Sequence, residues 1–130
     1  MNKFLFILSV MALMLAFSCT KENEDLIRGT WERINVADID DPYFYEWVFD
    51  EGELIMYRRL KTDPAVATIT DTGFYVLETN PLRTTLQLVD TSNEAWNEKW
   101  DVVRLDTEQL IIKLDIEGGV VMREFAKKSE

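Results

Sequence analysis

The chain has 130 residues, with 24 acidic and 14 basic side chains, no histidine, a single cysteine and a formal charge of -10. This length, with 47% hydrophobic residues, is enough for one globular domain. A strongly acidic surface repels phosphate backbones, so the charge argues against nucleic-acid binding. The lack of histidine removes imidazole acid-base chemistry and His-based metal sites from the candidate functions.

An apolar segment opens the chain. After Lys3, residues 4–17 are apolar apart from Ser9, and the next charged residue is Lys21. A basic start followed by a short apolar run predicts a secretory signal peptide. A membrane-spanning helix is the alternative, but it needs about 20 apolar residues, which is more than this run supplies.

Cys19 lies where the apolar segment gives way to charged residues. Left unmodified in an oxidising compartment, an unpaired thiol cross-links. The stretch LAFSC resembles the lipobox of bacterial lipoproteins, although Ala16 and Phe17 stand where leucine and a small residue are usual. The resemblance implies cleavage after Ser18, a diacylglyceryl group on the Cys19 sulfur and usually an acyl chain on the new amino terminus. Two or three such chains hold a protein on a membrane, whereas one binds only marginally.

Three regions follow from this reading. Residues 1–18 are the expected signal peptide, residues 19–25 the lipidated cysteine with a polar tether that does not pack, and residues 26–130 the folded domain. Acidic residues just after the cysteine resemble the export signal of some Gram-negative surface lipoproteins. Thr20 is not the aspartate that typically retains lipoproteins in the inner membrane. The resemblance implies the outer membrane and leaves open which of its faces.

Beyond residue 25, short runs of β-branched and aromatic residues alternate with turn-forming stretches such as DIDDP, TSNE and EGG. The pattern predicts strands, and the short connections favour antiparallel neighbours. We expect eight of them, over 27–36, 43–50, 53–61, 67–78, 83–90, 96–105, 109–116 and 119–127.

The stretch YFYEWVFDEGELIMYRRL predicts a hairpin with Glu51 and Gly52 as a two-residue turn. Asp50 then faces Glu53, and two directly opposed acids indicate a bulge or a looser turn. The same register gathers four apolar side chains on one face: Trp47, Phe49, Leu54 and Met56.

Eight strands with one apolar face need a way to bury that face. A sheet closed on itself does so and removes its edges, so we expect an all-β, eight-stranded up-and-down barrel. A sandwich of two sheets is the alternative, but the uniformly short connections argue against it.

The stretch LIRGTWERI carries Gly29-x-Trp31, which resembles the signature that opens lipocalins and their calycin relatives. Together with the strand pattern and the leader, it resembles the small lipocalin-like lipoproteins of bacteria. The resemblance implies that Trp31 plugs one end of the barrel and that a late arginine packs over it. Arg123, in VVMREFAKK, is the candidate, and a guanidinium over an indole contributes roughly 0.5 to 2 kcal/mol.

The resemblance also implies a non-catalytic module that binds a small apolar or amphipathic ligand and needs no cofactor. The hairpin register places Arg58 toward one end of the wall, where it could meet a ligand carboxylate; a salt bridge to a nearby acid is the alternative. The expected wall residues are Trp47, Phe49, Leu54 and Met56.

A second reading keeps the barrel but fills it with side chains. Trp47, Phe49, Met56, Phe74 and Trp100 are bulky enough to do so. The protein would then be a surface accessory lipoprotein whose loops bind a protein or glycan partner, with Tyr43, Tyr45 and Trp96 as candidate exposed aromatics. Ordinary packing within the barrel is the alternative for each of the three, and the favoured one.

Two further chemistries have little support. A carboxylate-dependent hydrolase ranks last, because 24 acidic residues always offer some pair at a suitable separation. Asp38, Asp40 and Asp41 supply oxygen ligands, but their spacing does not fit an EF-hand, so we expect a solvated loop and no metal site.

Overall fold

The computed structural model describes residues 2–34 and 39–129, without the side chains of residues 12, 13 and 15–20. Asp38, considered above for calcium, lies outside the described residues. The elements in chain order are α1 (Asn2–Ile27), β1 (Gly29–Arg33), β2 (Tyr43–Asp50), β3 (Glu53–Leu60), β4 (Asp63–Thr79), β5 (Thr84–Val89), β6 (Lys99–Leu105), β7 (Gln109–Ile116) and β8 (Gly119–Lys127).

The eight strands form one antiparallel sheet that closes into a ring. Each strand pairs with the next, and β8 pairs with β1. The expected up-and-down order of eight antiparallel strands is confirmed, and β2, β7 and β8 have the predicted ranges. β1 begins later than predicted because α1 extends to Ile27. β6 begins later because backbone hydrogen bonds from Asn97 to Glu94 and from Glu98 to Trp96 form turns ahead of it.

The β2–β3 hairpin has the predicted register over its whole length. Glu51 and Gly52 have φ angles of 46° and 88°, as a two-residue hairpin turn of the primed type requires. The expected bulge is wrong, because Asp50 pairs directly with Glu53. The repulsion is relieved by exposure and by Arg28, whose Nε lies 3.8 Å from Oδ1 of Asp50.

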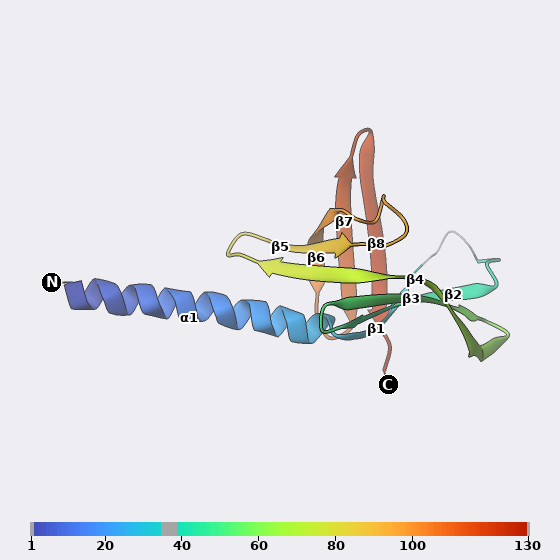
Figure 1. Cartoon of the computed structure of the whole chain (residues 1–130), viewed down its shortest axis with the longest axis horizontal. Helices are drawn as coiled ribbons and strands as arrows, with labels where there is room; N and C mark the ends of the chain where they lie inside the picture. Colours follow the sequence, from blue (N-terminus) through green and yellow to red (C-terminus); the bar gives the residue numbers. More distant parts are fainter. Residues whose placement is uncertain (1, 35–38, 130) are drawn as a thin grey trace.

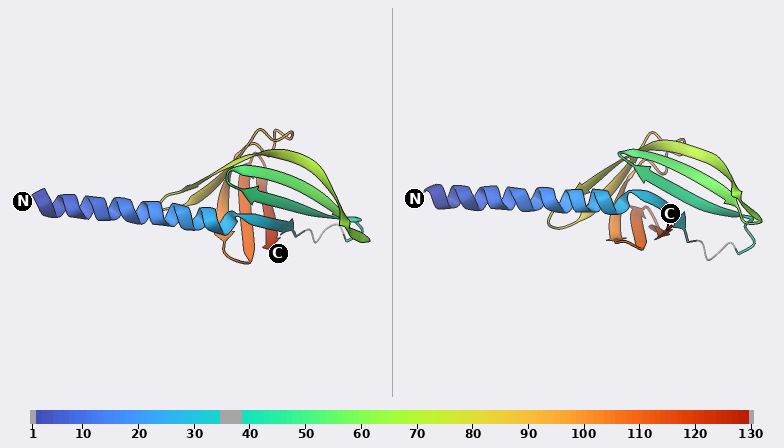
Figure 2. Two further views of the ribbon diagram at one scale, coloured as in Figure 1. Left: turned by 60° about the horizontal axis from the view of Figure 1, so that its bottom comes forward. Right: turned by 90° about the horizontal axis from the view of Figure 1, so that it is seen from below.

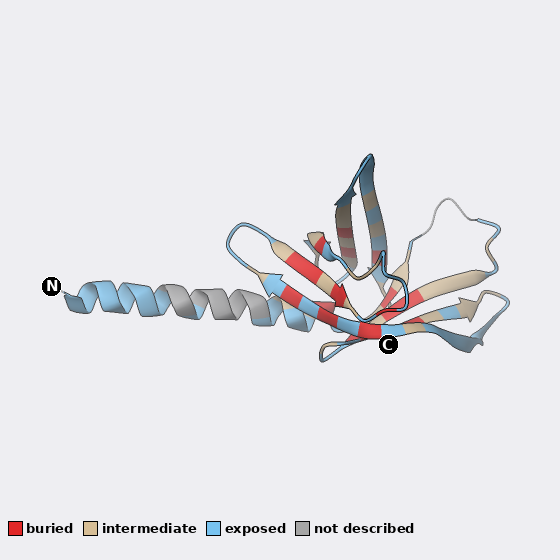
Figure 3. Cartoon of the chain, turned by 45° about the horizontal axis from the view of Figure 1, so that its top comes forward, coloured by how far each residue is buried: buried red, intermediate tan, exposed pale blue. Residues whose placement is uncertain are grey.

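Apolar side chains fill the inside of the ring. Buried residues lie along the middle of the strands, whereas the hairpin tips are exposed (Figure 3). Phe74, expected among the filling residues, is 51% exposed, because Tyr75 and Leu77 take the inward positions of β4. The buried apolar residues are Ile27, Trp31, Trp47, Phe49, Leu54, Met56, Tyr75, Leu77, Leu86, Leu88, Trp100, Leu110, Ile112 and Phe125.

The two ends of the ring differ (Figures 1 and 2). We call the end that meets α1 the closed end. At the opposite end, the residues of β4 before Phe74 pair only with β3. The tip of the β7–β8 hairpin, beyond Lys113 and Glu124, pairs with no other strand that the structure describes. The β3–β4 and β7–β8 hairpins point in different directions, and we call this end of the ring the flared end.

The last carbonyl groups of α1 find donors on the ring at the closed end. Trp31 donates its indole Nε1–H to the Ile27 carbonyl at 2.7 Å. Lys127 donates from Nζ to the Leu26 carbonyl at 2.9 Å and to the Arg28 carbonyl. Side chains of β1 and β8 therefore satisfy helix-end acceptors that would otherwise need water or a cap.

The cation over Trp31 is Lys127, so the expectation for Arg123 is wrong. The Nζ atom of Lys127 lies 4.6 Å from the indole ring. The reason is the β1–β8 register, which places Lys127 directly opposite Trp31 and Arg123 four residues away. Gly29 makes room for this lysine: its φ is +123°, and a Cβ there would lie 3.0 Å from Cε of Lys127.

The end of α1 also packs against the β4–β5 hairpin. Asn23 Nδ2 donates to Oγ1 of Thr79 at 3.0 Å, and Ile27 is fully buried. The expectation that residues 19–25 do not pack is therefore wrong for Asn23, because α1 continues to Ile27 and its last turns meet the ring. Within the described residues, no helix is both long and apolar enough to cross a membrane.

Truncation of Trp31 tests the packing of the closed end. We expect Trp31→Ala to lower the free energy of unfolding by about 3 to 5 kcal/mol, as a large buried side chain is lost. Urea unfolding measures the change, and Phe74→Ala, at an exposed position of β4, serves as the control with a small effect. A Trp31→Ala loss no larger than that of the control contradicts the role of Trp31.

Candidate functional site

The four predicted wall residues lie inside the ring and are packed by other side chains. Trp47, Phe49, Leu54 and Met56 are all at most 7% exposed. The Trp47 ring lies 4.8 Å from that of Phe125, centroid to centroid, and Phe49 lies 5.0 Å from Tyr75. These residues fill the interior of the ring, and Phe49 and Leu54 lie level with Gly29 at its closed end.

Trp96, from the connection between β5 and β6, covers this core toward the flared end. Its ring lies 5.0 Å from Trp47 and stacks on Trp100 at 5.7 Å. Trp100 also donates its Nε1–H to the Trp96 carbonyl at 3.1 Å. Trp96, considered above as an exposed loop aromatic, is instead half-buried.

Three arginines lie over aromatic rings at the flared end. The guanidinium carbon lies 4.8 Å from the ring centroid for Arg33 over Tyr45, 4.7 Å for Arg58 over Tyr43 and 5.4 Å for Arg123 over Trp96. Arg58 is the predicted polar residue, and the structure places it at this end, exposed. Sequence reasoning missed Arg33, although its position two residues after Trp31 puts both on the same face of β1.

Asp41 is hydrogen-bonded to Tyr43 and Tyr45, the two tyrosines under Arg58 and Arg33. It accepts a hydrogen bond from the backbone N–H of Tyr43 at 3.0 Å. Burial and a hydrogen bond with Asp41 raise the pKa of Tyr45. Among the side chains that the structure describes, no group of three or more Asp, Glu, Cys or His residues has an arrangement suited to a metal ion.

An open cavity of about 240 Å³ lies beside Arg33. Its lining combines cations, aromatic rings and carboxylates, and includes Arg33, Tyr43, Tyr45, Lys61, Glu32 and Asp41. Such a mixture suits a ligand with both a charged and an apolar part.

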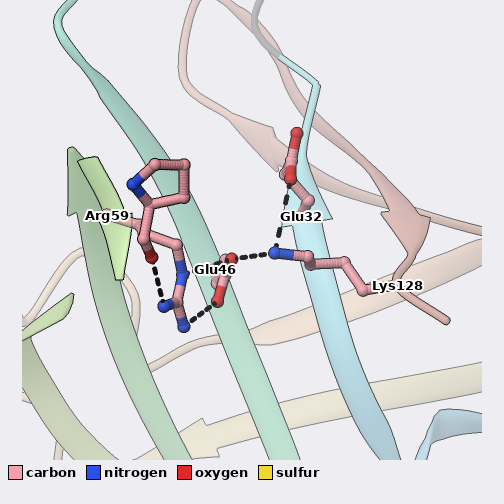
Figure 4. A network of polar contacts seen from close by, with 5 residues as sticks. Glu32, Glu46, Arg59 and Lys128 are labelled. Carbon is pink, nitrogen blue, oxygen red and sulfur yellow. Dashed lines mark hydrogen bonds and ion pairs between the residues drawn. The ribbon is translucent and has the colours of Figure 1, made fainter. Parts of the chain in front are cut away.

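A second polar cluster lies on the outer face of the ring (Figure 4). The Glu46 side chain is 1% exposed, and Arg59 holds its carboxylate with contacts of 3.1 and 3.3 Å from Nε and Nη2. Lys128 donates to the same carboxylate and lies 3.9 Å from Glu32. Arg59 also donates to the Pro64 carbonyl at 2.7 Å, so the cluster joins β1, β2, the start of β4 and the C-terminal segment.

Glu46 is ionised in this cluster. Burial raises the pKa of its carboxyl, but the hydrogen bonds from Arg59 and Lys128 outweigh burial and hold the pKa below its ordinary value. Alternation with the inward Trp47 puts Glu46 on the outer face, but that pattern gives no sign of its burial, because Lys128 reaches it from the far end of the chain. The cluster fastens the C-terminal segment to the ring.

Comparison with family models, with curated proteins and with solved structures gave no match. Cys19 lies within α1, and its side chain is not among those described. The family and the lipid modification therefore stay predictions from the sequence.

Replacement of Glu46 tests the outer cluster. A depressed carboxyl pKa stabilises the fold above the pKa of the unfolded chain, and this stability disappears as the pH falls through the folded-state pKa. We expect Glu46→Gln to cost about 1 to 3 kcal/mol at neutral pH, because two cations lose their partner. The cost should shrink in the acid range below the ordinary glutamate pKa.

Thermal unfolding across pH measures this difference. Glu53→Gln, at the exposed end of the β2–β3 hairpin, is the matched control and should change stability by less than about 0.5 kcal/mol. A Glu46→Gln cost that stays constant from neutral to acid pH contradicts the assignment.

Proposed function

We propose that this chain is a lipid-anchored, non-catalytic binding module of the outer membrane, a lipocalin-like barrel whose flared end binds a small apolar or amphipathic molecule. The contrast between the two ends of the ring carries the proposal. The last residues of α1 pack on the closed end, whereas the flared end opens between diverging hairpins and presents aromatic rings and cations.

The lipocalin-like character has support at the closed end. Gly29 and Trp31 begin a ring of eight up-and-down strands, and a cation of the last strand packs over the indole, although it is a lysine where the family resemblance implies an arginine. That cation is Lys127, and the close approach of its side chain explains why position 29 is glycine.

The packing of α1 supports a defined orientation on the membrane. Asn23 is bonded to the closed end, and Cys19 precedes it by four residues, about 6 Å along a helix. After removal of residues 1–18, acyl chains on Cys19 would hold the closed end close to the bilayer. The flared end would then face away from the membrane and receive its ligand from the aqueous side.

The filled interior and the exposed hairpins favour a second candidate function, that of an accessory lipoprotein without a cargo. The interior of the ring is filled by side chains, and the β3–β4 and β7–β8 hairpins expose apolar residues at the flared end. These are Val66, Ile69, Ile116, Val120 and Met122, each at least 47% exposed. An accessory lipoprotein that binds a protein or glycan partner with this end would show the same features.

Substitution of Cys19 tests the anchor. We expect wild-type protein to incorporate labelled palmitate and to sediment with membranes, and Cys19→Ala to incorporate none, because the sulfur that carries the lipid is gone. Ser92→Ala, in the mature domain, should behave as wild type. Membrane attachment of Cys19→Ala protein that has lost residues 1–18 contradicts the anchor.

Native mass spectrometry tests the ligand. Protein purified from its own cells should retain a small molecule of discrete mass, because an aromatic and cationic site holds an amphipathic ligand through purification. Protein that is consistently empty, and whose tryptophan fluorescence does not respond to added lipids, contradicts the binding module and favours the second candidate.

A further inference from the structure

The arginines at the flared end lie side by side on the inner face of the sheet. Tyr45 pairs directly with Arg58 across β2 and β3. Arg33 pairs with Phe125 across β1 and β8, and Arg123 is two residues before Phe125 on the same face. Four neighbouring strands, β8, β1, β2 and β3, thus contribute one group that we call the arginine row: Arg123, Arg33, Tyr45 and Arg58.

The three cations of the arginine row have no anionic partner among the described residues. The ion pairs of the described chain use Arg28, Arg59, Arg83, Arg104, Lys99 and Lys128. Nη1 of Arg123 donates only to the adjacent Met122 carbonyl, at 3.0 Å, and its Nε is buried without an acceptor. Each guanidinium instead stacks on a ring, which leaves N–H groups along its edge available.

Two carboxylates on this side of the ring, Asp41 and Asp71, bond to other donors. Asp41 accepts from the backbone N–H of Tyr43 and bonds with Tyr45. Asp71, on the inner face of β4, accepts from the backbone N–H groups of Thr72 and Ser92 at 2.8 and 3.1 Å. Within the described part of the chain, neither Asp41 nor Asp71 forms an ion pair with an arginine of the row.

Like charges that lie close together without a counter-ion repel one another. Burial, and then the charge of Arg33, lower the pKa of Arg123, as expected for two neighbouring guanidinium groups. An anion bound between the guanidinium groups would remove this repulsion and give the N–H groups of Arg123 an acceptor. Guanidinium groups bind carboxylates and phosphates through paired N–H donors.

We propose that the arginine row binds the anionic head group, a carboxylate or a phosphate, of an amphipathic ligand. Arg33, Arg58 and Arg123 donate N–H groups to the head group. The apolar body lies against Trp96 and the half-buried Leu114 and Val121, which pack on the core below. This inference rests on the proposed binding function and specifies its ligand class.

Four probes with the same octyl chain and different head groups test the inference. The full chain, held in phosphatidylcholine vesicles, is titrated with octanoate, monooctyl phosphate, octanol and octyltrimethylammonium. Tryptophan fluorescence is the readout, because Trp96 lies directly under Arg123. We expect at least one of the two anions to bind about tenfold or more tightly than octanol, and the cation to bind more weakly than octanol.

The variant is the double substitution Arg33→Gln and Arg58→Gln, which leaves the partly buried Arg123 in place. It should lose about tenfold or more in affinity for the anions and little for octanol. Arg83→Gln, at the closed end, is the matched control and should bind as wild type. Thermal unfolding of all variants verifies that each is folded.

The outcomes separate this inference from the proposed function. Selective binding of octanoate alone, of monooctyl phosphate alone or of both supports the inference and identifies the head group. Equal binding of octanol and the anions, unaffected by the double substitution, overturns the anion site and leaves the binding module standing. No binding of any probe by folded wild-type protein overturns both.

Discussion

The hydrogen bonds that join the end of α1 to the ring are the contacts on which the rest of the structure depends. Trp31 lies on the first strand in the chain and Lys127 on the last. Both donate to carbonyl groups of the same helix terminus. They can do so only when β1 pairs with β8 and closes the ring. Closure of the sheet, burial of the indole and attachment of the helix therefore depend on one another, and they make the two ends of the ring different.

Local features of the fold could be read from the sequence. Apolar residues at every second position placed Trp47, Phe49, Leu54 and Met56 on one face, and the turn residues Glu51 and Gly52 determined which residues oppose each other. These are short-range rules, since a two-residue turn leaves little freedom in register. The position of Arg58 at the end of the wall followed from the same register. Closure into a ring was predicted on a different ground, namely the need of eight strands to bury one apolar face.

Features that depend on contacts between distant segments could not be read in this way. Choosing Lys127 rather than Arg123 as the partner of Trp31 requires the β1–β8 register, which no local turn determines. Alternation with Trp47 places Glu46 on the outer face and so suggests an exposed side chain. Glu46 is buried, because Lys128 from the C-terminal segment lies over it. The arginine row joins residues of β8, β1 and β3 that are far apart in the chain, and only the hint from Arg58 pointed to it. The polar composition of residues 19–25 suggested a loose tether, whereas Asn23 binds the β4–β5 hairpin.

The central claim is that the closed end is held toward the anchor and the flared end points away from it. Site-directed fluorescence quenching tests this claim most directly. Fluorophores are attached through Leu82→Cys, at the closed end, or Glu117→Cys, at the tip of the β7–β8 hairpin, in protein bound to vesicles that carry nitroxide head groups. Both positions are exposed. The account predicts strong quenching at residue 82 and little at residue 117, and equal quenching at both positions, or stronger quenching at residue 117, would contradict it.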